Sequence, residues 1–168
     1  SDALEASKDV LSVYNELEDM NNSTTLPNSY KSKESIVALE RFSSNLYTAV
    51  DMPASEFISL YRSGDQRRTK YFKRVTSSTY SLLKGRSDEF SCSFRTAEFY
   101  LTAAEAAARL GHTTDAINYL TPLMAKRLNA SAYETTTALI GTMTEEELIQ
   151  EILDERAREL AFEGHRWY

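Results

Sequence analysis

The N-terminal segment carries apolar side chains at the spacing of an amphipathic helix. The apolar positions recur at steps of three and seven residues and are Leu4, Leu11, Tyr14 and Leu17. Such steps place the side chains on one face of a helix. A run of five polar residues, 21–25, follows and interrupts the pattern. We therefore predict a helix over residues 3–20.

Patterns between residues 26 and 84 are shorter and weaker. Prolines interrupt residues 26–54, where only Ser35–Leu39 has the composition of a strand. A short helix is expected over Ser55–Arg62, because apolar residues share one side and Ser63–Gly64 follows as a stop. Residues 69–84 are rich in Tyr, Phe, Val and Thr and are broken by two serines. This composition predicts two short strands that form a hairpin.

From residue 94 onward, Ala, Leu, Glu and Arg dominate, and we expect three helices. The first covers about residues 94–110 and is followed by Gly111 as a C-terminal cap. The second begins at Thr113 or Thr114. Pro122 lies inside this second helix, where proline removes one backbone hydrogen bond. A kink or break is therefore expected near Tyr119.

The third helix has the clearest boundaries in the sequence. Thr144 followed by Glu147 forms a capping box, and an apolar stripe runs from Leu148 to Ala161. Gly164 is expected to end the helix.

Residues 97–129 also fit the pattern of a tetratricopeptide-like helical hairpin. Small residues at Ala104, Ala107 and Ala116 allow two helices to approach closely. One such unit cannot bury its faces alone, so neighbouring units are implied. The sequence thus predicts a mainly α fold of tetratricopeptide-like helical hairpins with a small strand and loop portion in residues 35–84.

Composition excludes some classes of protein. The formal charge of −6 argues against a nucleic-acid partner, because such affinity comes largely from Lys and Arg. The single Cys92 excludes an internal disulfide, and no stretch is long and apolar enough to span a bilayer. One basic concentration stands out, which we interpret as a solvated face or structural ion pairs, with an anion site as the alternative: Arg67, Arg68, Lys70, Lys73 and Arg74.

Catalytic motifs are lacking in the sequence. There is no nucleophile elbow, no zinc-protease motif and no phosphate-binding glycine run, and only His112 and His165 could act as imidazole bases. Glu155, Glu159 and Glu163 are spaced four apart beside several arginines, and paired carboxylates can hydrolyse glycosides. We interpret this alternation of charge as surface ion pairing along one helix.

Two stretches resemble the SusD/RagB family of outer-membrane nutrient-binding lipoproteins. The more specific stretch is residues 152–168, ILDERARELAFEGHRWY, and the other is residues 94–106, FRTAEFYLTAAEA. Residues 32–39 and 64–68 are weaker matches, to the family's mid-chain strand and its Asp-x-Arg turn. The resemblance thus covers most of the chain, which we expect to be a single domain over residues 1–168, with a helix plus loop and strand region in 1–93 and a helical signature region in 94–168.

The resemblance implies a surface-exposed, non-catalytic lipoprotein of Bacteroidetes-type bacteria without an obligatory cofactor or metal. Such a protein binds oligosaccharide or peptide and covers a SusC-like TonB-dependent transporter. Family members are several times longer and carry a signal peptide, a lipidated cysteine and N-terminal helical repeats. We therefore expect this chain to be a C-terminal-half piece that meets the membrane only through a lipid anchor outside it.

The resemblance also separates fold residues from candidate ligand contacts. Signature residues such as Glu155, Arg158, Gly164 and Trp167 resemble family positions that hold the fold. In relatives, sugar-facing aromatics lie on variable loops, several between the mid-chain strand and the Asp-x-Arg turn. Here that interval offers Phe42 and Tyr47, and Tyr30 lies just before the strand. Together these three aromatics predict a sugar-binding platform, because aromatic faces stack on pyranose rings. The alternative is that Phe42 and Tyr47 pack inward.

Two other functions remain as alternatives at this point. One is a helical-repeat scaffold that binds protein partners through a groove, or a peptide-binding member of the same family. The other is a hydrolase that uses the glutamate pairs.

Overall fold

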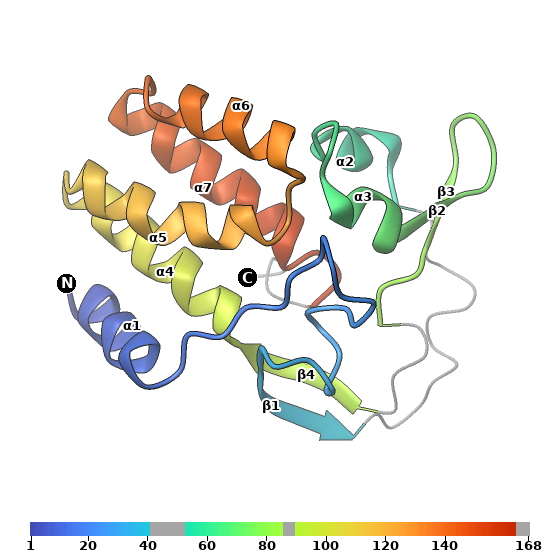
Figure 1. Ribbon diagram of the computed structural model, residues 1–168, viewed down its shortest axis with the longest axis horizontal. Helices are drawn as coiled ribbons and strands as arrows, with labels where there is room; N and C mark the ends of the chain where they lie inside the picture. Colours follow the sequence, from blue (N-terminus) through green and yellow to red (C-terminus); the bar gives the residue numbers. More distant parts are fainter. Residues whose placement is uncertain (41–52, 86–89, 164–168) are drawn as a thin grey trace.

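The computed structural model describes residues 1–40, 53–85 and 90–163 and has a mainly helical fold (Figure 1). The helices are α1 (Asp2–Val13), α2 (Ser55–Ser59), α3 (Gln66–Lys70), α4 (Thr96–Arg109), α5 (Thr113–Ala125), α6 (Ala130–Ile140) and α7 (Glu145–Glu159). The strands are β1 (Ser35–Glu40), β2 (Phe72–Arg74), β3 (Tyr80–Leu82) and β4 (Phe90–Arg95). The predicted fold class is confirmed.

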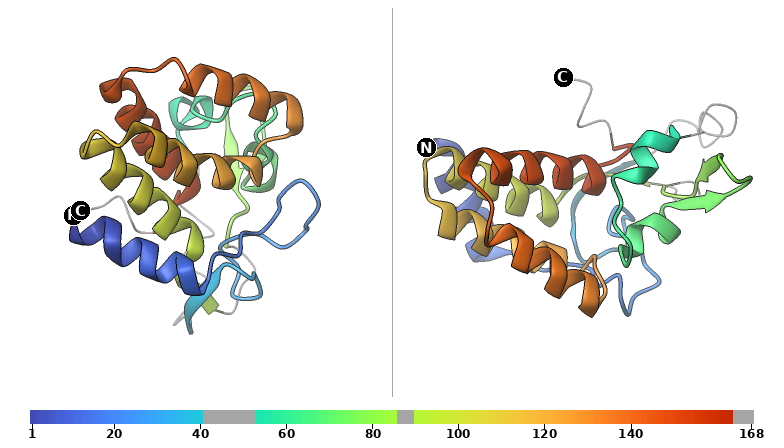
Figure 2. Two further views of the ribbon diagram at one scale, coloured as in Figure 1. Left: turned by 60° about the vertical axis from the view of Figure 1, so that its left-hand side comes forward. Right: turned by 90° about the horizontal axis from the view of Figure 1, so that it is seen from above.

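Five helices form the body of the molecule, with α4 packed against α1, α5 and α7 (Figures 1 and 2). Ala104, Ala107 and Ala116 are fully buried between these helices, and their small side chains permit close approach. Gly111 connects α4 to α5 with a φ of +75°, a conformation that glycine adopts without a Cβ penalty. The predicted helical hairpin is therefore confirmed, with Gly111 at its turn.

The first helix is shorter than predicted, because α1 ends at Val13 rather than near residue 20. The backbone beyond it bonds to distant segments: the Glu18 N–H donates to Glu34 Oε1 at 2.8 Å, and the Met20 N–H donates to the Lys126 carbonyl at 2.9 Å. Leu17 is buried, as the pattern indicated, but it reaches the core from non-helical chain. Tertiary hydrogen bonds here override local periodicity.

The strands form two separate antiparallel pairs. β1 confirms the predicted strand at residues 35–39 and pairs with β4, and Val37 lies opposite Phe94. Phe94 was predicted on a helix, but it belongs to β4 and α4 begins only at Thr96. β2 and β3 form the predicted hairpin, which projects from the body beside α3 (Figure 1).

A kink or a break was predicted near Tyr119, and the break does not occur, because α5 continues through Pro122 to Ala125. Pro122 and Asn118, whose carbonyl would accept the missing bond, both lie on the exposed face of the helix. Water can therefore satisfy that carbonyl. The buried residues Leu120 and Leu123 on either side of the proline hold the helix against the core.

The C-terminal half contains four helices rather than the predicted three, and α6 is the one that was not predicted. Its sequence, ASAYETTTALI, contains three consecutive threonines, which are weak helix formers. Asn129 starts the helix by accepting a hydrogen bond from the Ala132 N–H at 2.9 Å, and Ile140 is buried. Capping and one-sided packing stabilise a helix that composition did not indicate.

Helix α7 begins as predicted and ends early. Thr144 and Glu147 form the capping box, but the helix stops at Glu159 rather than at Gly164, which lies outside the described residues. The Lys84 ammonium donates to the carbonyls of Glu159 and Ala161, both at 2.9 Å. This side chain therefore satisfies carbonyls at the end of the helix in the way that a C-terminal cap does.

Two apolar cores lie side by side in this fold. The helical core includes Leu101, Leu120 and Leu148. The second core contains Met20, Ile58, Tyr61, Tyr71, Phe72 and Leu82, from the loop after α1, α2 and the β2–β3 region. No helix among the described residues is long and apolar enough to cross a membrane.

Candidate functional site

Among the described residues, charged side chains gather in a buried network of ion pairs that borders both cores. It joins six carboxylates to six cations and therefore carries no net charge. Its members are Glu34, Asp65, Glu151, Glu155, Glu159 and Glu163, with Arg62, Arg67, Lys84, Arg95, Arg127 and Arg158. All except Arg62 and Glu163 are buried, and the side chain of Glu163 is itself only 6% exposed.

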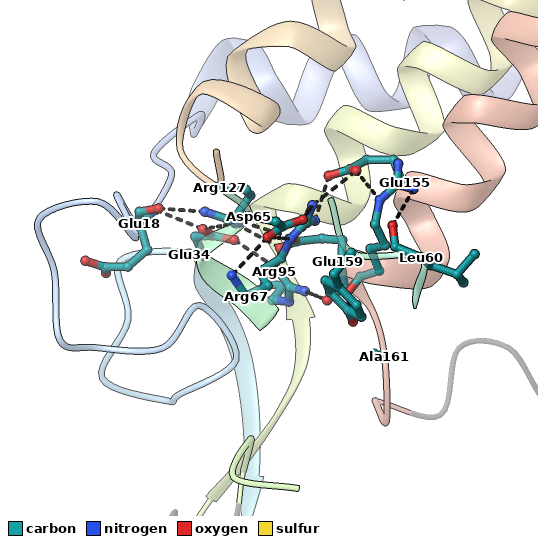
Figure 3. A network of polar contacts seen from close by, with 12 residues as sticks. Glu18, Glu34, Leu60, Asp65, Arg67, Arg95, Arg127, Glu155, Glu159 and Ala161 are labelled. Carbon is teal, nitrogen blue, oxygen red and sulfur yellow. Dashed lines mark hydrogen bonds and ion pairs between the residues drawn. The ribbon is translucent and has the colours of Figure 1, made fainter. Parts of the chain in front are cut away.

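Glu159, near the end of α7, lies at the centre of this network. Its Oε1 lies 2.5 Å from Arg95 Nη1 and 2.9 Å from Arg127 Nη2. Its Oε2 accepts from Arg67 Nη1 and Arg127 Nε, both at 2.9 Å. Figure 3 shows the three arginines converging on this carboxylate. One side chain of α7 therefore fixes α3, the end of β4 and the α5–α6 connection.

Glu34 links the start of β1 to the same arginines. Its two carboxylate oxygens lie 2.6 Å from Arg127 Nη2 and 3.0 Å from Arg95 Nη1. Its backbone carbonyl accepts from the Thr96 N–H at 3.0 Å, at the start of α4. Because Glu34 precedes β1 and Arg95 ends β4, these contacts fix the base of the β1–β4 pair against α7.

Asp65 and Arg67 form the predicted Asp-x-Arg turn. The Asp65 side chain caps α3 by accepting from the Arg67 N–H at 2.9 Å, and its second oxygen accepts from Arg67 Nη2 at 2.8 Å. Arg67 Nη1 then reaches Glu155 Oε1 on α7 at 2.6 Å. The turn thus places the fully buried Arg67 guanidinium against α7, the helix that carries the first part of the family-like stretch 152–168.

Lys84 and Glu163 close the network at the end that follows α7. Lys84 Nζ lies 2.5 Å from Glu163 Oε1 and 4.3 Å from the centroid of the Tyr71 ring. Glu163 also accepts from Arg95 Nε and Nη2, both at 2.8 Å. Phe162, which directly precedes Glu163, has a φ of +61°, which is unusual for a bulky side chain.

The arginines keep the buried carboxylates ionised. Burial alone would raise the pKa of Glu159, but Arg127, Arg95 and Arg67 outweigh it and hold that pKa well below the ordinary value. The pKa of Glu155 is also lowered, because Arg67 and Arg158 overcome the effect of burial. For Lys84, burial dominates and lowers the pKa to about 8, although Glu163 opposes the shift.

This arrangement is suited to holding the fold and not to acid catalysis. A glycosidase needs a carboxylic acid with a raised pKa beside its substrate, whereas Glu155 and Glu159 have lowered pKa values and no exposed surface. The structure therefore contradicts the hypothesis that these two residues form a hydrolytic pair. It also corrects the interpretation of their helix as a site of surface ion pairing, because Glu155, Arg158 and Glu159 are buried.

Of the predicted sugar-binding aromatics, one lies within the described residues. Tyr30 is partly exposed, and the Lys31 ammonium lies 5.2 Å from its ring centroid. Phe42 and Tyr47 fall in residues 41–52, outside the described part of the chain, so their grouping with Tyr30 stays a prediction. Within residues 1–40, 53–85 and 90–163, no group of three or more His, Cys, Asp or Glu side chains is placed to hold a metal ion.

Sequence reasoning missed several members of the network, among them Glu34, Arg95 and Arg127. Glu34 and Arg95 stood inside stretches that carried the family resemblance, but nothing marked them as partners. Arg127 had no such signal, because it follows α5 in a connection that no motif covers. Their ion pairs join residues 32 to 93 positions apart, which no local pattern can show.

The family model of the SusD family matches residues 62–168, which is more than half of the chain. That segment contains most of the network described above. A comparison with curated proteins found no match.

Solved structures with a similar fold come from Bacteroides species. A SusD superfamily protein from Bacteroides fragilis superposes with a TM-score of 0.75 at 22% identity, and covers 97% of this chain and 41% of its own length. A SusD-like carbohydrate-binding protein from Bacteroides vulgatus gives a TM-score of 0.67 at 21% identity, with 96% and 39% covered. A SusD superfamily protein from Bacteroides thetaiotaomicron gives 0.72 at 20%, with 96% and 43% covered. The chain therefore spans about two fifths of the length of these structures.

Proposed function

Because this chain belongs to the SusD family, we propose that it is part of a non-catalytic glycan-binding protein of the bacterial outer-membrane surface. In this proposal a lipid anchor, on a cysteine outside these 168 residues, holds the protein at the membrane. The bound oligosaccharide then passes to a SusC-like TonB-dependent transporter.

The observation that carries the proposal is the place of the signature residues. Glu155, Arg158 and Glu159, from the stretch that resembles the family, are buried in the ion-pair network together with Arg67 of the Asp-x-Arg turn. Residues buried in this way support a scaffold and cannot contact a ligand. Recognition of a glycan therefore falls to surface side chains that the scaffold positions.

We propose that the glycan binds at the surface near the start of β1. Tyr30 precedes β1 by five residues and is partly exposed, and Phe42 and Tyr47 follow β1 directly in the sequence. Glu34 fixes the base of β1 through Arg95 and Arg127. We propose that Tyr30, Phe42 and Tyr47 stack on the apolar faces of pyranose rings.

A glycan array followed by calorimetry on the 168-residue chain tests the proposal. We expect binding of an oligosaccharide that Tyr30→Ala and Tyr47→Ala each weaken by about three- to tenfold, which corresponds to the loss of one aromatic stacking contact. Tyr30→Phe and Tyr47→Phe keep the ring faces and should retain binding. An unchanged binding profile in both alanine variants would remove the platform.

Two further measurements separate the alternatives. Turnover of a chromogenic glycoside would contradict the non-catalytic proposal. Binding of peptides in place of glycans would support a peptide-binding protein or a protein-interaction scaffold, which is the second candidate. Co-purification of the longer gene product with a TonB-dependent transporter would test the partner directly.

A further inference from the structure

Among the described residues, the basic side chains without a carboxylate partner gather on one segment, although the chain as a whole is acidic. Five of the described Lys and Arg side chains have no carboxylate partner, and four of these lie in residues 68–74. We call these four the basic surface: Arg68, Lys70, Lys73 and Arg74. The fifth is Lys31, which lies over the Tyr30 ring.

The segment around the basic surface contains no acidic residue that could neutralise it locally. No Asp or Glu occurs in residues 66–87, and Asp65, just before this range, is fully engaged by Arg67. Apart from Lys31, the exposed cations elsewhere in the described chain are paired with carboxylates, for example Lys8 with Glu5 and Arg109 with Glu105. The positive charge on the basic surface is therefore available to a ligand.

The available donors can be counted residue by residue. Arg68 and Lys73 are exposed, and neither makes an ion pair within the described part of the chain. Arg74 is exposed and gives Nε and Nη2 to the carbonyls of Thr76 and Ser77, both at 3.0 Å, which leaves Nη1 for a ligand. Lys70 is the least available, because its ammonium already donates to the Met20 and Ser23 carbonyls.

Neighbouring groups fit an anionic sugar. The turn between β2 and β3 exposes Ser77 and Ser78, whose hydroxyls can donate to carboxylate or sulfate oxygens. The Thr76 hydroxyl is already bonded to Thr79 Oγ1 and to the N–H groups of Ser78 and Thr79 within the turn. Tyr80 is partly exposed and lies directly opposite Arg74 in the β2–β3 register. A ring for stacking, hydroxyl donors and cations thus occur on one projecting hairpin and the helix before it (Figure 1).

We propose that the basic surface binds an acidic oligosaccharide, with uronic-acid carboxylates or sulfate groups that pair with Arg68, Lys73 and Arg74. This inference rests on the proposed function and names the substrate class. The net charge of −6 does not prevent such binding, because at physiological salt charges more than about 8 Å apart are largely screened. The four residues span at most about 20 Å of backbone, which suits a few sugar units rather than a long nucleic acid.

Calorimetry of the 168-residue chain with four probes tests the substrate class. The probes are a hexamer of galacturonic acid, a sulfated heparin hexasaccharide, neutral maltohexaose and hexaglutamate. We expect one or both acidic sugars to bind, and the affinity to fall as salt rises from 50 to 200 mM. Which acidic sugar binds more tightly distinguishes carboxylate from sulfate.

A double variant identifies the surface. Arg68→Gln with Lys73→Gln should weaken binding of the acidic hexasaccharide about tenfold, since each exposed ion pair contributes a factor of about two to five. The matched control, Lys8→Gln with Arg109→Gln, removes the same charge from α1 and α4 and should leave the affinity unchanged. Among the described residues, neither Arg68 nor Lys73 makes a side-chain hydrogen bond or ion pair, so circular dichroism should show both variants folded.

Three outcomes would overturn the inference. They are the absence of binding to both acidic sugars, an equal loss in the two double variants, and hexaglutamate that binds as tightly as the acidic sugars. If a neutral glycan binds and acidic sugars do not, the proposed function stands and this inference falls. If no glycan of any kind binds, both fall together.

Discussion

Arg95 and Glu159, which are 64 residues apart in the chain, contact each other twice. Arg95 Nη1 lies 2.5 Å from Glu159 Oε1, and Arg95 Nη2 donates to the Glu159 backbone carbonyl at 2.8 Å. The first contact pairs charges, and the second satisfies a carbonyl at the end of α7. Together they join the start of α4 to the end of α7, so the network determines how the helices meet.

Glu159→Gln should destabilise the protein by about 3–5 kcal/mol. The substitution keeps the size of the side chain but leaves three buried arginines short of one negative charge, and an uncompensated buried charge is costly. Urea unfolding followed by circular dichroism measures the effect. The control is Glu134→Gln on the exposed face of α6, which should change the free energy of unfolding by less than about 0.5 kcal/mol. Equal effects in both variants would contradict a central role for Glu159.

Acid should unfold the protein through the same carboxylates. The pKa values of Glu155, Glu159 and Glu163 are lowered in the folded state despite burial, because arginines face each of them. The unfolded chain therefore binds protons first as the pH falls below about 4.5. Stability should be constant from pH 7 to about 5 and should decrease at lower pH.

Urea titrations at pH 7, 5, 4 and 3 measure this decrease. Glu163→Gln removes one of the three shifted groups and should make the pH dependence shallower. A free energy of unfolding that stays constant down to pH 3 would show that the carboxylates are not held ionised by the network.

Lys84 should give a dependence of the same sign at alkaline pH, where stability again rises with pH. Burial lowers its pKa from 10.5 to about 8, so between these values the unfolded chain holds a proton that the folded chain has lost. The free energy of unfolding should therefore rise with pH, by at most about 3 kcal/mol between pH 8 and 10.5. Burial raises the pKa of Tyr61 and Tyr71, which reduces stability only above about pH 10.

Unfolding measured between pH 7.5 and 9.5 isolates the lysine. The rise should be lost in Lys84→Met and kept in Lys73→Met, which removes an exposed lysine of the same segment. A rise of equal size in both variants would assign the effect to another group.

Local patterns predicted the parts of the fold that depend on neighbouring residues. The capping box at Thr144 and Glu147, the turn glycine Gly111 and the β2–β3 hairpin are signals within a few residues, and each was confirmed. The end of α1 could not be predicted in this way. It depends on Glu34 and Lys126, which accept hydrogen bonds from Glu18 and Met20 and draw the chain out of the helix.

The charged residues show the same limit. Alternating Glu and Arg on a helix is typical of a solvated face, and nothing near Glu155 or Glu159 in the sequence indicates that Arg67 and Arg127 cover them. Only the resemblance to a family marked these positions as structural. For the basic cluster, sequence reasoning kept two interpretations, structural or solvated charges and an anion site. The structure shows that different residues of the cluster differ: Arg67 is buried in ion pairs, whereas Arg68 and Lys73 are exposed and make no ion pair within the described residues.

Gly64 connects the second core to the helical body and should tolerate no side chain. Its φ is +84°, and a Cβ would lie 2.7 Å from the Ala132 Cβ and 2.8 Å from Asn129 Oδ1. The Gly64 carbonyl also accepts from the Asn129 N–H at 2.9 Å, at the start of α6, so a shift to relieve the clash would disturb that contact and the Asn129 cap. Gly64→Ala should therefore destabilise by about 1–3 kcal/mol, the cost of a strained backbone, with the clash in addition.

The chain offers a matched control in Gly141→Ala. Gly141 ends α6 with a φ of −64°, and a Cβ there would meet nothing closer than 3.6 Å. Because alanine restricts the unfolded chain more than glycine does, this variant should be neutral or more stable by about 0.4–1 kcal/mol. Urea unfolding of the two variants side by side should thus give effects of opposite sign. If Gly64→Ala were as stable as the wild type, the close approach of residues 62–65 to the start of α6 would be wrong, and so would the path that brings Asp65 and Arg67 to α7.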